Sequence, residues 1–210
     1  MALTDAQRAY ALIRERLITT EMRPGAVIEE TALQAEFGLG RTPIREALKQ
    51  LEAERLVVVS PRRGMYVSEV TLADLRHIEE VRLALDTLCA RLAVERIEPY
   101  QLETLRELAA EVEEGASKCT PREALALDRK FHALLRAASH NPILADECEA
   151  LFDLSQRTWY LLIDRLLPAD LCGSTFREML EAAEQDDPDG AEAAMERHIR
   201  QMGAAIKRII

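Results

Sequence analysis

The chain has 210 residues, of which 48% are hydrophobic, so it is long enough to bury a sizeable core. Its formal net charge is −10, but both signs are mixed along the chain, which argues against disorder. No apolar run approaches the ~18 residues of a membrane helix, and the N-terminal stretch is polar and amphipathic, so we expect a soluble cytoplasmic protein. The four cysteines form no CxxC pair, which argues against a disulfide framework or a zinc ribbon.

The charge is distributed unevenly. Residues 1–72 contain ten basic and ten acidic residues, so the whole net charge of −10 falls on the remainder. Within 41–63 there are six basic residues against three acidic ones. A local basic site on a neutral N-terminal part predicts a module that binds a polyanion, joined to an acidic part with another role.

Helical periodicity predicts the first elements over 5–21 and 30–37, and a third helix in the stretch "GRTPIREALKQL" at 40–51. Thr42 precedes a proline and is expected at the N-cap, with Pro43 as the first helical residue. The expected buried face is Ile44, Ala47, Leu48 and Leu51, which leaves Arg41, Arg45 and Lys49 together on another face.

Two β-branched runs follow, "LVVVS" and "MYVSEV", separated by "PRRG". Gly64 can take the positive φ that a hairpin turn often needs. Three helices and a β-hairpin predict a winged helix-turn-helix domain over residues 1–70.

From Thr71 onward the pattern is helical throughout, with a capping box at Thr120 and Glu123. The expected helices cover 72–96, 99–117, 121–139, 142–167, 174–186 and 189–209. Short connections between them predict an all-α antiparallel bundle over residues 71–210. The fold class is therefore mainly α, with a small β-hairpin wing.

The basic residues of the third helix stand where a helix-turn-helix meets DNA. Arg41 and Arg45 lie at the end that reaches base edges, and an arginine fork can take guanine O6 and N7 together. Thr42 suits a phosphate, and Lys49 lies farther along, where the DNA backbone passes. Arg62 and Arg63 on the wing can follow phosphates or enter the minor groove. A solvated face paired with neighbouring glutamates is the alternative.

The bundle also carries candidate ligands. Asp128 and His132 are four residues apart and share a helix face, and His198 lies on the last helix. One carboxylate and two imidazoles form a reasonable metal set, but a satisfied polar cluster in the core has the same composition. Trp159 either lines a pocket in the bundle or fills its core.

The stretch "FGLGRTPIREALKQLEAERLVVVSPRRGMYV" resembles the recognition helix and wing of GntR-type transcription regulators. The resemblance implies operator-binding homodimers that read palindromic sites in double-stranded DNA. Its usual DNA contacts correspond to Arg41, Thr42, Arg45 and the wing around Gly64. Gly40 departs from the hydroxylic residue that is common before the arginine. Arg55 replaces a usual glycine, where it either adds a phosphate contact or strains the turn.

The segments "LDRKFHALLRAASHNPIL" and "GAEAAMERHI" are similar to the FadR branch, in the subset with an FCD ligand-binding domain. The resemblance implies a divalent metal (Zn, Ni or Mn) held by Asp128, His132 and His198. A further histidine of that subset is replaced here by Phe176. Two outcomes stay open, a site with three protein ligands or a polar pocket without metal.

That resemblance also implies an organic acid as the effector. The expected pocket residues are Arg82, Phe176 and Trp159, although Asp86 is placed to neutralise Arg82 instead. The predicted function is a sequence-specific transcription regulator, a repressor, whose operator affinity an organic acid controls. An effector-independent DNA-binding dimer with a vestigial pocket is the alternative. An enzyme is not expected, because no general base, nucleophile elbow or phosphate loop is evident.

Overall fold

The computed structural model describes residues 3–61, 64–115, 119–165 and 174–209. It divides into two compact units. The first contains Met1–Leu72 together with Gln156–Leu161, and the second contains Ala73–Ser155 and Leu162–Ile210.

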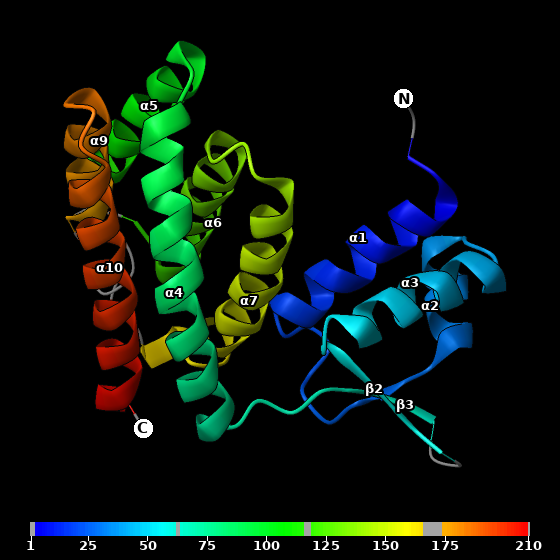
Figure 1. The fold of residues 1–210 in the computed structure, drawn as a ribbon. Coiled ribbons are helices and arrows are strands. Elements are labelled where there is room, and N and C mark those ends of the chain that lie inside the picture. The colour runs from blue at the N-terminus through cyan, green and yellow to red at the C-terminus, as the bar shows by residue number, and fades with distance from the viewer. Residues whose placement is uncertain (1–2, 62–63, 116–118, 166–173, 210) are drawn as a thin grey trace. The chain divides into compact units, whose positions relative to one another are not determined.

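Three helices form most of the first unit: α1 (Asp5–Ile18), α2 (Glu30–Phe37) and α3 (Arg41–Ala53). Helix α3 packs against both α1 and α2, and Figure 1 shows the three grouped beside a small sheet. A capping box between Thr4 and Gln7 begins α1. The buried face of α3 is the predicted one, namely Ile44, Ala47, Leu48 and Leu51.

The sheet has three antiparallel strands in the order β1-β3-β2. They are β1 (Val27–Ile28), β2 (Val57–Ser60) and β3 (Gly64–Val67). Strands β2 and β3 form the predicted hairpin. Strand β1 was not predicted, because two residues are too few to show an alternating pattern. It pairs with β3 through the partners Val27–Tyr66 and Ile28–Met65.

The beginning of α3 differs from the prediction. Gly40 is the N-cap, and Arg41, Thr42 and Pro43 already lie within the helix. Thr42 is therefore not the N-cap residue. Proline is tolerated in the first turn because the N–H groups there have no partner within the helix, and because the residue four positions earlier lies outside it.

Positive φ angles mark the turns of this unit. Gly38 caps α2 at φ 64°, and Gly64 has φ 95° at the start of β3, as a hairpin turn requires. Arg55, just after α3, has φ 63° without being glycine. A side chain with a Cβ is strained there by roughly 1–2 kcal/mol.

Arg55→Gly is accordingly expected to raise the free energy of unfolding of the protein by about 1 kcal/mol, because it removes that strain. Urea denaturation of both proteins measures the difference. Arg8→Gly, within α1, is the matched control and is expected to lower stability by about 1 kcal/mol. If Arg55→Gly is less stable than the wild type, the contacts of the Arg55 side chain stabilise the protein by more than the backbone strain destabilises it.

The end of α7 (Pro142–Leu161) belongs to the first unit, and its Arg157 is almost fully buried. Arg157 donates from Nη1 to Ser68 Oγ and from Nη2 to the Ser68 carbonyl oxygen, both at 2.6 Å. Burial lowers the pKa of Arg157 to about 10. Two short hydrogen bonds from a charged donor offset part of the cost of burying the guanidinium.

Six α-helices and one 3₁₀ turn are described in the second unit or reach into it. They are α4 (Leu72–Arg96), α5 (Pro99–Gly115), α6 (Pro121–Ala138), α7 (Pro142–Leu161), η1 (Ile163–Arg165), α9 (Thr175–Glu184) and α10 (Pro188–Ile209). The helix predicted over 142–167 was too long, since α7 ends at Leu161 and a tighter turn follows. The capping box of Thr120 and Glu123 begins α6 as predicted.

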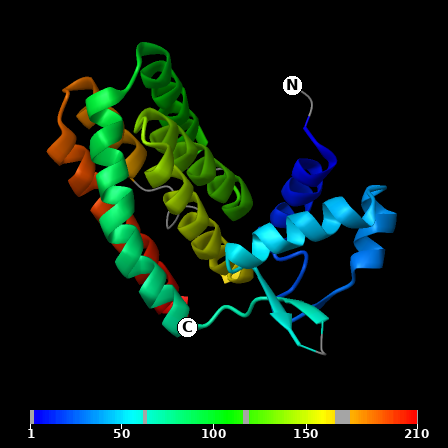
Figure 2. The same cartoon turned by 45° about the vertical axis from the view of Figure 1, so that its right-hand side comes forward.

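Ion pairs show that α4 and α10 are antiparallel. Arg91, late in α4, pairs with Asp189 early in α10, and Glu79, early in α4, pairs with Lys207 late in α10. Figures 1 and 2 show the two helices side by side in both views. Helix α5 packs against α6 and α9, and α9 packs against α10. The predicted fold class, a winged helix-turn-helix followed by an all-helical bundle, is confirmed. Among the described residues, no helix combines the length and the apolar character of a membrane span.

Candidate functional site: a basic helix face and a buried ligand cluster

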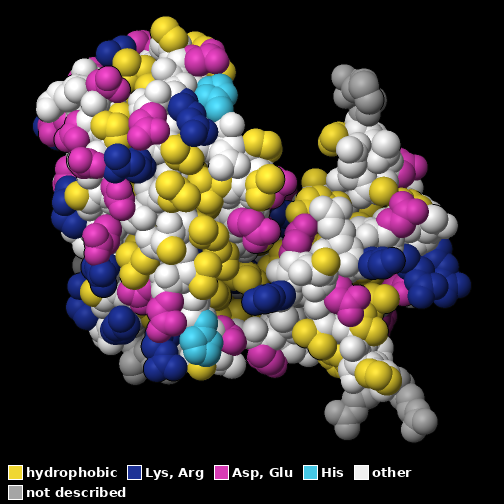
Figure 3. Space-filling model, viewed as in Figure 1, with side chains coloured by type: hydrophobic (Ala, Val, Ile, Leu, Met, Phe, Trp, Pro, Cys, Tyr) yellow, Lys and Arg dark blue, Asp and Glu magenta, His cyan; other side chains and the backbone are white. Residues whose placement is uncertain are grey.

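The first candidate site is the N-terminal half of α3. The side chains of Arg41 and Arg45 lie one turn apart and are 71% and 55% exposed. Thr42 and Lys49 are exposed as well. Figure 3 shows basic side chains gathered over the part of this unit where α2 and α3 lie. The residues expected to meet DNA on α3 therefore share one accessible surface.

Glu30, the first residue of α2, contacts both arginines of this surface. Its Oε2 lies 3.6 Å from Arg41 Nε, and its Oε1 lies 3.6 Å from Arg45 Nε. One carboxylate thus restrains two exposed guanidinium groups. Glu30 was not predicted as part of this site, because nothing along the chain shows which face of α2 lies next to α3.

The backbone at the start of α3 adds a second feature. Gly40 has no side chain that could cap the first turn, so the N–H groups there are not occupied by an N-cap side chain. Such groups, with the helix dipole, favour an anion. The wing begins at Gly64, while Arg62 and Arg63 lie outside the described residues.

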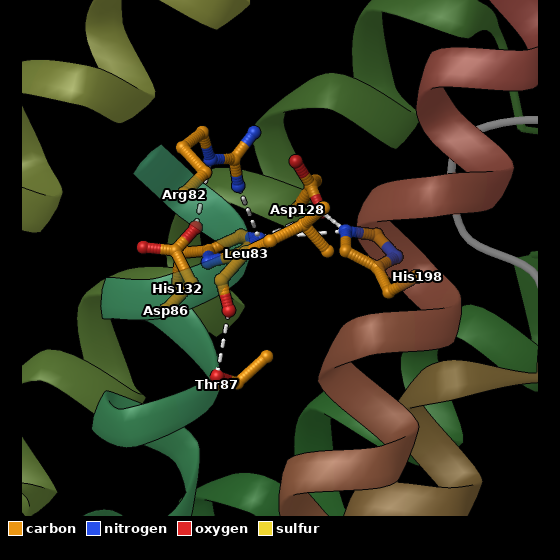
Figure 4. A network of polar contacts seen from close by, with 7 residues as sticks. All are labelled: Arg82, Leu83, Asp86, Thr87, Asp128, His132 and His198. Atoms are coloured by element: carbon orange, nitrogen blue, oxygen red, sulfur yellow. Dashed lines mark hydrogen bonds and ion pairs between the residues drawn. The ribbon is translucent and has the colours of Figure 1, made fainter. Parts of the chain in front are cut away.

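The second candidate site is buried in the bundle and joins α6 to α10. Asp128 and His132 lie on α6 and His198 on α10, and all three are buried. Asp128 Oδ1 lies 3.2 Å from His198 Nε2 and 3.7 Å from His132 Nε2, and the two Nε2 atoms are 3.4 Å apart. Figure 4 shows the carboxylate and the two rings facing one another.

These distances fit one shared metal ion. Two donors bound to Zn²⁺ at about 2.0–2.1 Å in a tetrahedral arrangement lie about 3.4 Å apart. Asp128 Oδ1 is buried and has no hydrogen-bond partner, although His198 Nε2 is near. Buried polar atoms normally have partners, so this oxygen lacks something that a cation would supply. The three side chains therefore suit a divalent metal.

The protonation of His132 favours the same use. Burial lowers the pKa of His132 well below its usual range, and the nearby Arg82 guanidinium lowers it further. The ring is therefore neutral near pH 7 and keeps the lone pair that a metal needs.

Arg82 is paired with Asp86, one of the two possibilities that the sequence left open. Arg82 Nε donates to Asp86 Oδ2 at 2.7 Å, and both side chains are buried. Its Nη2 lies 3.5 Å from His132 Nε2 (Figure 4). Arg82 is thus largely neutralised but still borders the metal candidate.

Two further arginines and Phe152 surround this cluster. The guanidinium carbons of Arg82, Arg129 and Arg136 lie 5.3, 5.2 and 5.6 Å from the Phe152 ring centroid. Arg129 donates to Asp153 at 2.8 Å, whereas Arg136 Nη1 is buried without a partner among the described residues. Arg136 was not predicted as part of this site. Its spacing of four residues after His132 was the signal that could have found it.

The two predicted aromatic pocket residues lie in different places. Phe176 on α9 is buried against Phe131, with ring centroids 4.3 Å apart, and Phe131 in turn packs edge-on against His132 and His198. Phe176 is therefore separated from the two imidazoles by one ring. Trp159 is also buried, but its segment belongs to the first unit, whereas the Asp128 cluster belongs to the second.

Comparison with known proteins agrees with this division. Residues 5–67 match bacterial regulatory proteins of the gntR family, and residues 77–201 match the FCD domain. The HTH-type transcriptional repressor RspR of Escherichia coli (strain K12) is 25% identical over 203 residues, covering 97% of this chain and 89% of RspR. An HTH-type transcriptional regulator in an unstable DNA locus of Streptomyces ambofaciens is 30% identical over 207 residues, covering 98% of this chain and 86% of its own length.

Among solved structures, E. coli McbR/YncC has a TM-score of 0.87 at 24% sequence identity and covers 99% of both chains. That likeness concerns the fold. The relatives are regulators of transcription, a class that acts by binding and not by catalysis. Because the FCD match covers more than half of the chain and the gntR match covers the N-terminal helices and sheet, the chain belongs to the GntR family of bacterial regulatory proteins, with an FCD domain as its C-terminal part.

Proposed function

We propose that the protein is a sequence-specific DNA-binding transcription regulator, a repressor, that acts as a homodimer on a palindromic operator. The observation that carries the proposal is the pair of exposed arginines, Arg41 and Arg45, at the N-terminal end of α3. In a helix-turn-helix protein that end of the recognition helix meets base edges in the major groove. Two protomers would place their recognition helices one DNA turn apart, roughly 34 Å, or a multiple of it.

Each residue of the basic surface has a distinct role in this proposal. Arg41 and Arg45 read bases through their planar forks, and guanine is the base that fits them best. Thr42 and the N–H groups of the first turn hold a phosphate, and Lys49 contacts the DNA backbone. Arg62, Arg63 and Gly64 are proposed to contact the adjacent DNA backbone or minor groove.

Selection of duplexes from a random pool by the purified protein tests the DNA half of the proposal. The expected result is an enriched palindrome with guanines in each half-site, bound far more tightly than unrelated DNA. Enrichment of no sequence above the starting pool would contradict it.

The contacts of Glu30 with Arg41 and Arg45 lead to a further prediction about DNA binding. Glu30→Gln removes a negative charge beside the DNA and frees both arginines, so we expect binding to unrelated duplexes to strengthen by about threefold. The ratio of specific to non-specific affinity should fall, because the carboxylate no longer restrains the guanidinium groups of Arg41 and Arg45. Fluorescence anisotropy with the selected duplex and an unrelated one measures both, and Glu29→Gln is the control with the same charge change. An unchanged ratio would contradict a positioning role for Glu30.

The second half of the proposal concerns the bundle, where a small organic acid is bound with the help of a divalent metal. Asp128, His132 and His198 would hold the metal, which would supply positive charge to the effector's oxygens. The buried, unpartnered Nη1 of Arg136 supports an anionic effector, because a carboxylate would satisfy it. Arg82 and Phe176 border the same region.

Control of DNA binding follows from two arrangements of the protein with different operator affinities. The effector shifts the balance only by its differential affinity for those arrangements, and DNA shifts effector affinity by the same factor. Operator titrations with a panel of small carboxylates, each with and without Zn²⁺, test this. At least one acid should change the operator affinity, and flat affinities across the panel would contradict the effector half while leaving the DNA half intact.

One observation favours the alternative of an effector-independent dimer. Phe131 packs against the two imidazoles and Phe176 packs against Phe131, and both phenyl rings are almost fully buried. If this packing leaves no room for a ligand, thermal unfolding will respond neither to metal nor to any carboxylate. The same protein would still select an operator.

A further inference from the structure

Two cysteines meet in the interior of the second unit although they lie on different helices. Cys89 on α4 and Cys148 on α7 are 3% and 1% exposed, and their thiols are close enough for each to shift the pKa of the other. With Leu144 they form a small buried cluster against which Leu85 and Leu92 pack. The pair has no part in the proposed binding of DNA, metal or effector.

The packing of these two side chains in one buried cluster favours a disulfide between them. Their sulfurs would have to come within about 2.05 Å of each other. Rotation of the two side chains and small shifts of α4 and α7 can supply that approach. Leu85, Leu92 and Leu144 surround the pair with apolar atoms, which exclude competing thiols.

The two sulfurs differ in acidity. The neighbouring Cys148 thiol stabilises the thiolate of Cys89 and lowers the pKa of Cys89, and the Arg136 guanidinium acts in the same direction. The neighbouring Cys89 and burial raise the pKa of Cys148, which keeps its proton. Cys89 is therefore the attacking sulfur, and Cys148 is the partner that resolves the intermediate.

We propose that hydrogen peroxide converts Cys89 and Cys148 into a reversible disulfide that links α4 to α7. The Cys89 thiolate attacks one peroxide oxygen and breaks the O–O bond, which gives a sulfenic acid and hydroxide. The Cys148 sulfur then attacks the sulfenic sulfur, and its S–OH bond breaks as the new S–S bond forms. Two thiols and one peroxide thus give one disulfide and two waters.

The proposed disulfide is connected to the Asp128 cluster through contacts of Asp86 and Arg82. Asp86 precedes Cys89 by one turn of α4 and accepts a hydrogen bond from Arg82, whose Nη2 lies 3.5 Å from His132 Nε2. Drawing Cys89 toward α7 moves this turn of α4, so the oxidised protein should bind Zn²⁺ several-fold more weakly or more tightly than the reduced one. This consequence rests on the proposed metal site, whereas the disulfide itself does not.

Peptide mapping of the full-length wild-type protein after treatment with hydrogen peroxide tests the proposal without any substitution. The expected product is a peptide pair joined through Cys89 and Cys148, with a mass lower by two hydrogen atoms than the two thiol peptides together. Dithiothreitol should restore both thiols. Recovery of both residues as free thiols, or as over-oxidised acids without the cross-link, would overturn the proposal.

Two variants make the assignment sharper. Cys119→Ser/Cys172→Ser leaves only the pair, and peroxide should remove both of its thiols as titrated with Ellman's reagent in denaturant. Adding Cys148→Ala should leave Cys89 as a sulfenic acid that dimedone captures. The counterpart variant carries Cys89→Ala in place of Cys148→Ala. If dimedone labels Cys148 in that variant but does not label Cys89 in the Cys148→Ala variant, the assigned order of attack is wrong.

Titrating Zn²⁺ into the oxidised and reduced forms then tests the coupling. A change in affinity of at least threefold is expected. If both forms bind Zn²⁺ equally, the coupling is wrong although the disulfide stands. If neither form binds Zn²⁺ while the cross-link forms, the proposed metal site fails and the disulfide stands.

Discussion

Arg45→Ala is expected to weaken binding to the selected operator by about 1–3 kcal/mol, which is roughly 5- to 150-fold in the dissociation constant. Binding to an unrelated duplex should fall much less, because that binding comes from phosphate contacts. The reason lies in the position of Arg45, which is exposed one turn into α3 beside Arg41. Fluorescence anisotropy at a fixed salt concentration, with both duplexes, measures the two losses.

Two matched variants separate base reading from simple charge. Arg62→Ala should weaken binding to all duplexes alike and flatten the dependence of log affinity on log salt concentration, because Arg62 is proposed to contact phosphates. Arg8→Ala removes an exposed arginine of α1 that pairs with Asp5 and should change neither duplex. If Arg45→Ala behaves like Arg62→Ala, Arg45 contacts phosphates and does not read bases.

The second large effect concerns metal. Zn²⁺ at a hundred times its dissociation constant is expected to raise the free energy of unfolding by about 2.7 kcal/mol, because the ion binds only the folded cluster. EDTA should reverse the gain. Thermal or urea unfolding of the full-length protein, with and without Zn²⁺, measures it.

Asp128→Asn sharpens this test, because its expected effect on the free energy of unfolding differs between the metal-free and the Zn²⁺-bound protein. Without metal the variant is expected to be at least as stable as the wild type, since a neutral amide replaces a buried carboxylate oxygen that has no partner. With Zn²⁺ it should gain little, because the amide is a weaker ligand. His140→Gln, at an exposed histidine outside the cluster, should keep the full metal response. A full response from Asp128→Asn would place the metal elsewhere.

Local rules predicted much of the fold. The buried face of α3 followed from helical periodicity, and the beginning of α6 followed from the capping box of Thr120 and Glu123. Strand β1 and the end of α7 were not predictable in this way. A strand of two residues gains its stability from pairing with β3, and the periodicity of α7 shows no break where the helix ends.

The candidate sites were predicted only as far as spacing along one helix allows. Asp128 and His132 are four residues apart and so share a face of α6, but His198 comes from α10, and no spacing along the chain shows that it lies beside them. Glu30 and the Cys89–Cys148 pair were missed because each joins two helices. Contacts of that kind depend on how helices pack, which single-chain periodicity does not determine.

The central claim is that the face of α3 carrying Arg41 and Arg45 binds duplex DNA. Its most direct test is an anisotropy titration at low salt of the wild type and the Arg41→Ala/Arg45→Ala variant, each with the selected operator and a scrambled duplex. The wild type is expected to bind both duplexes, the operator at least about a thousandfold more tightly, and the variant is expected to lose most of that difference. Failure of the wild type to bind any duplex, or equal preference for the operator in both proteins, would contradict the account.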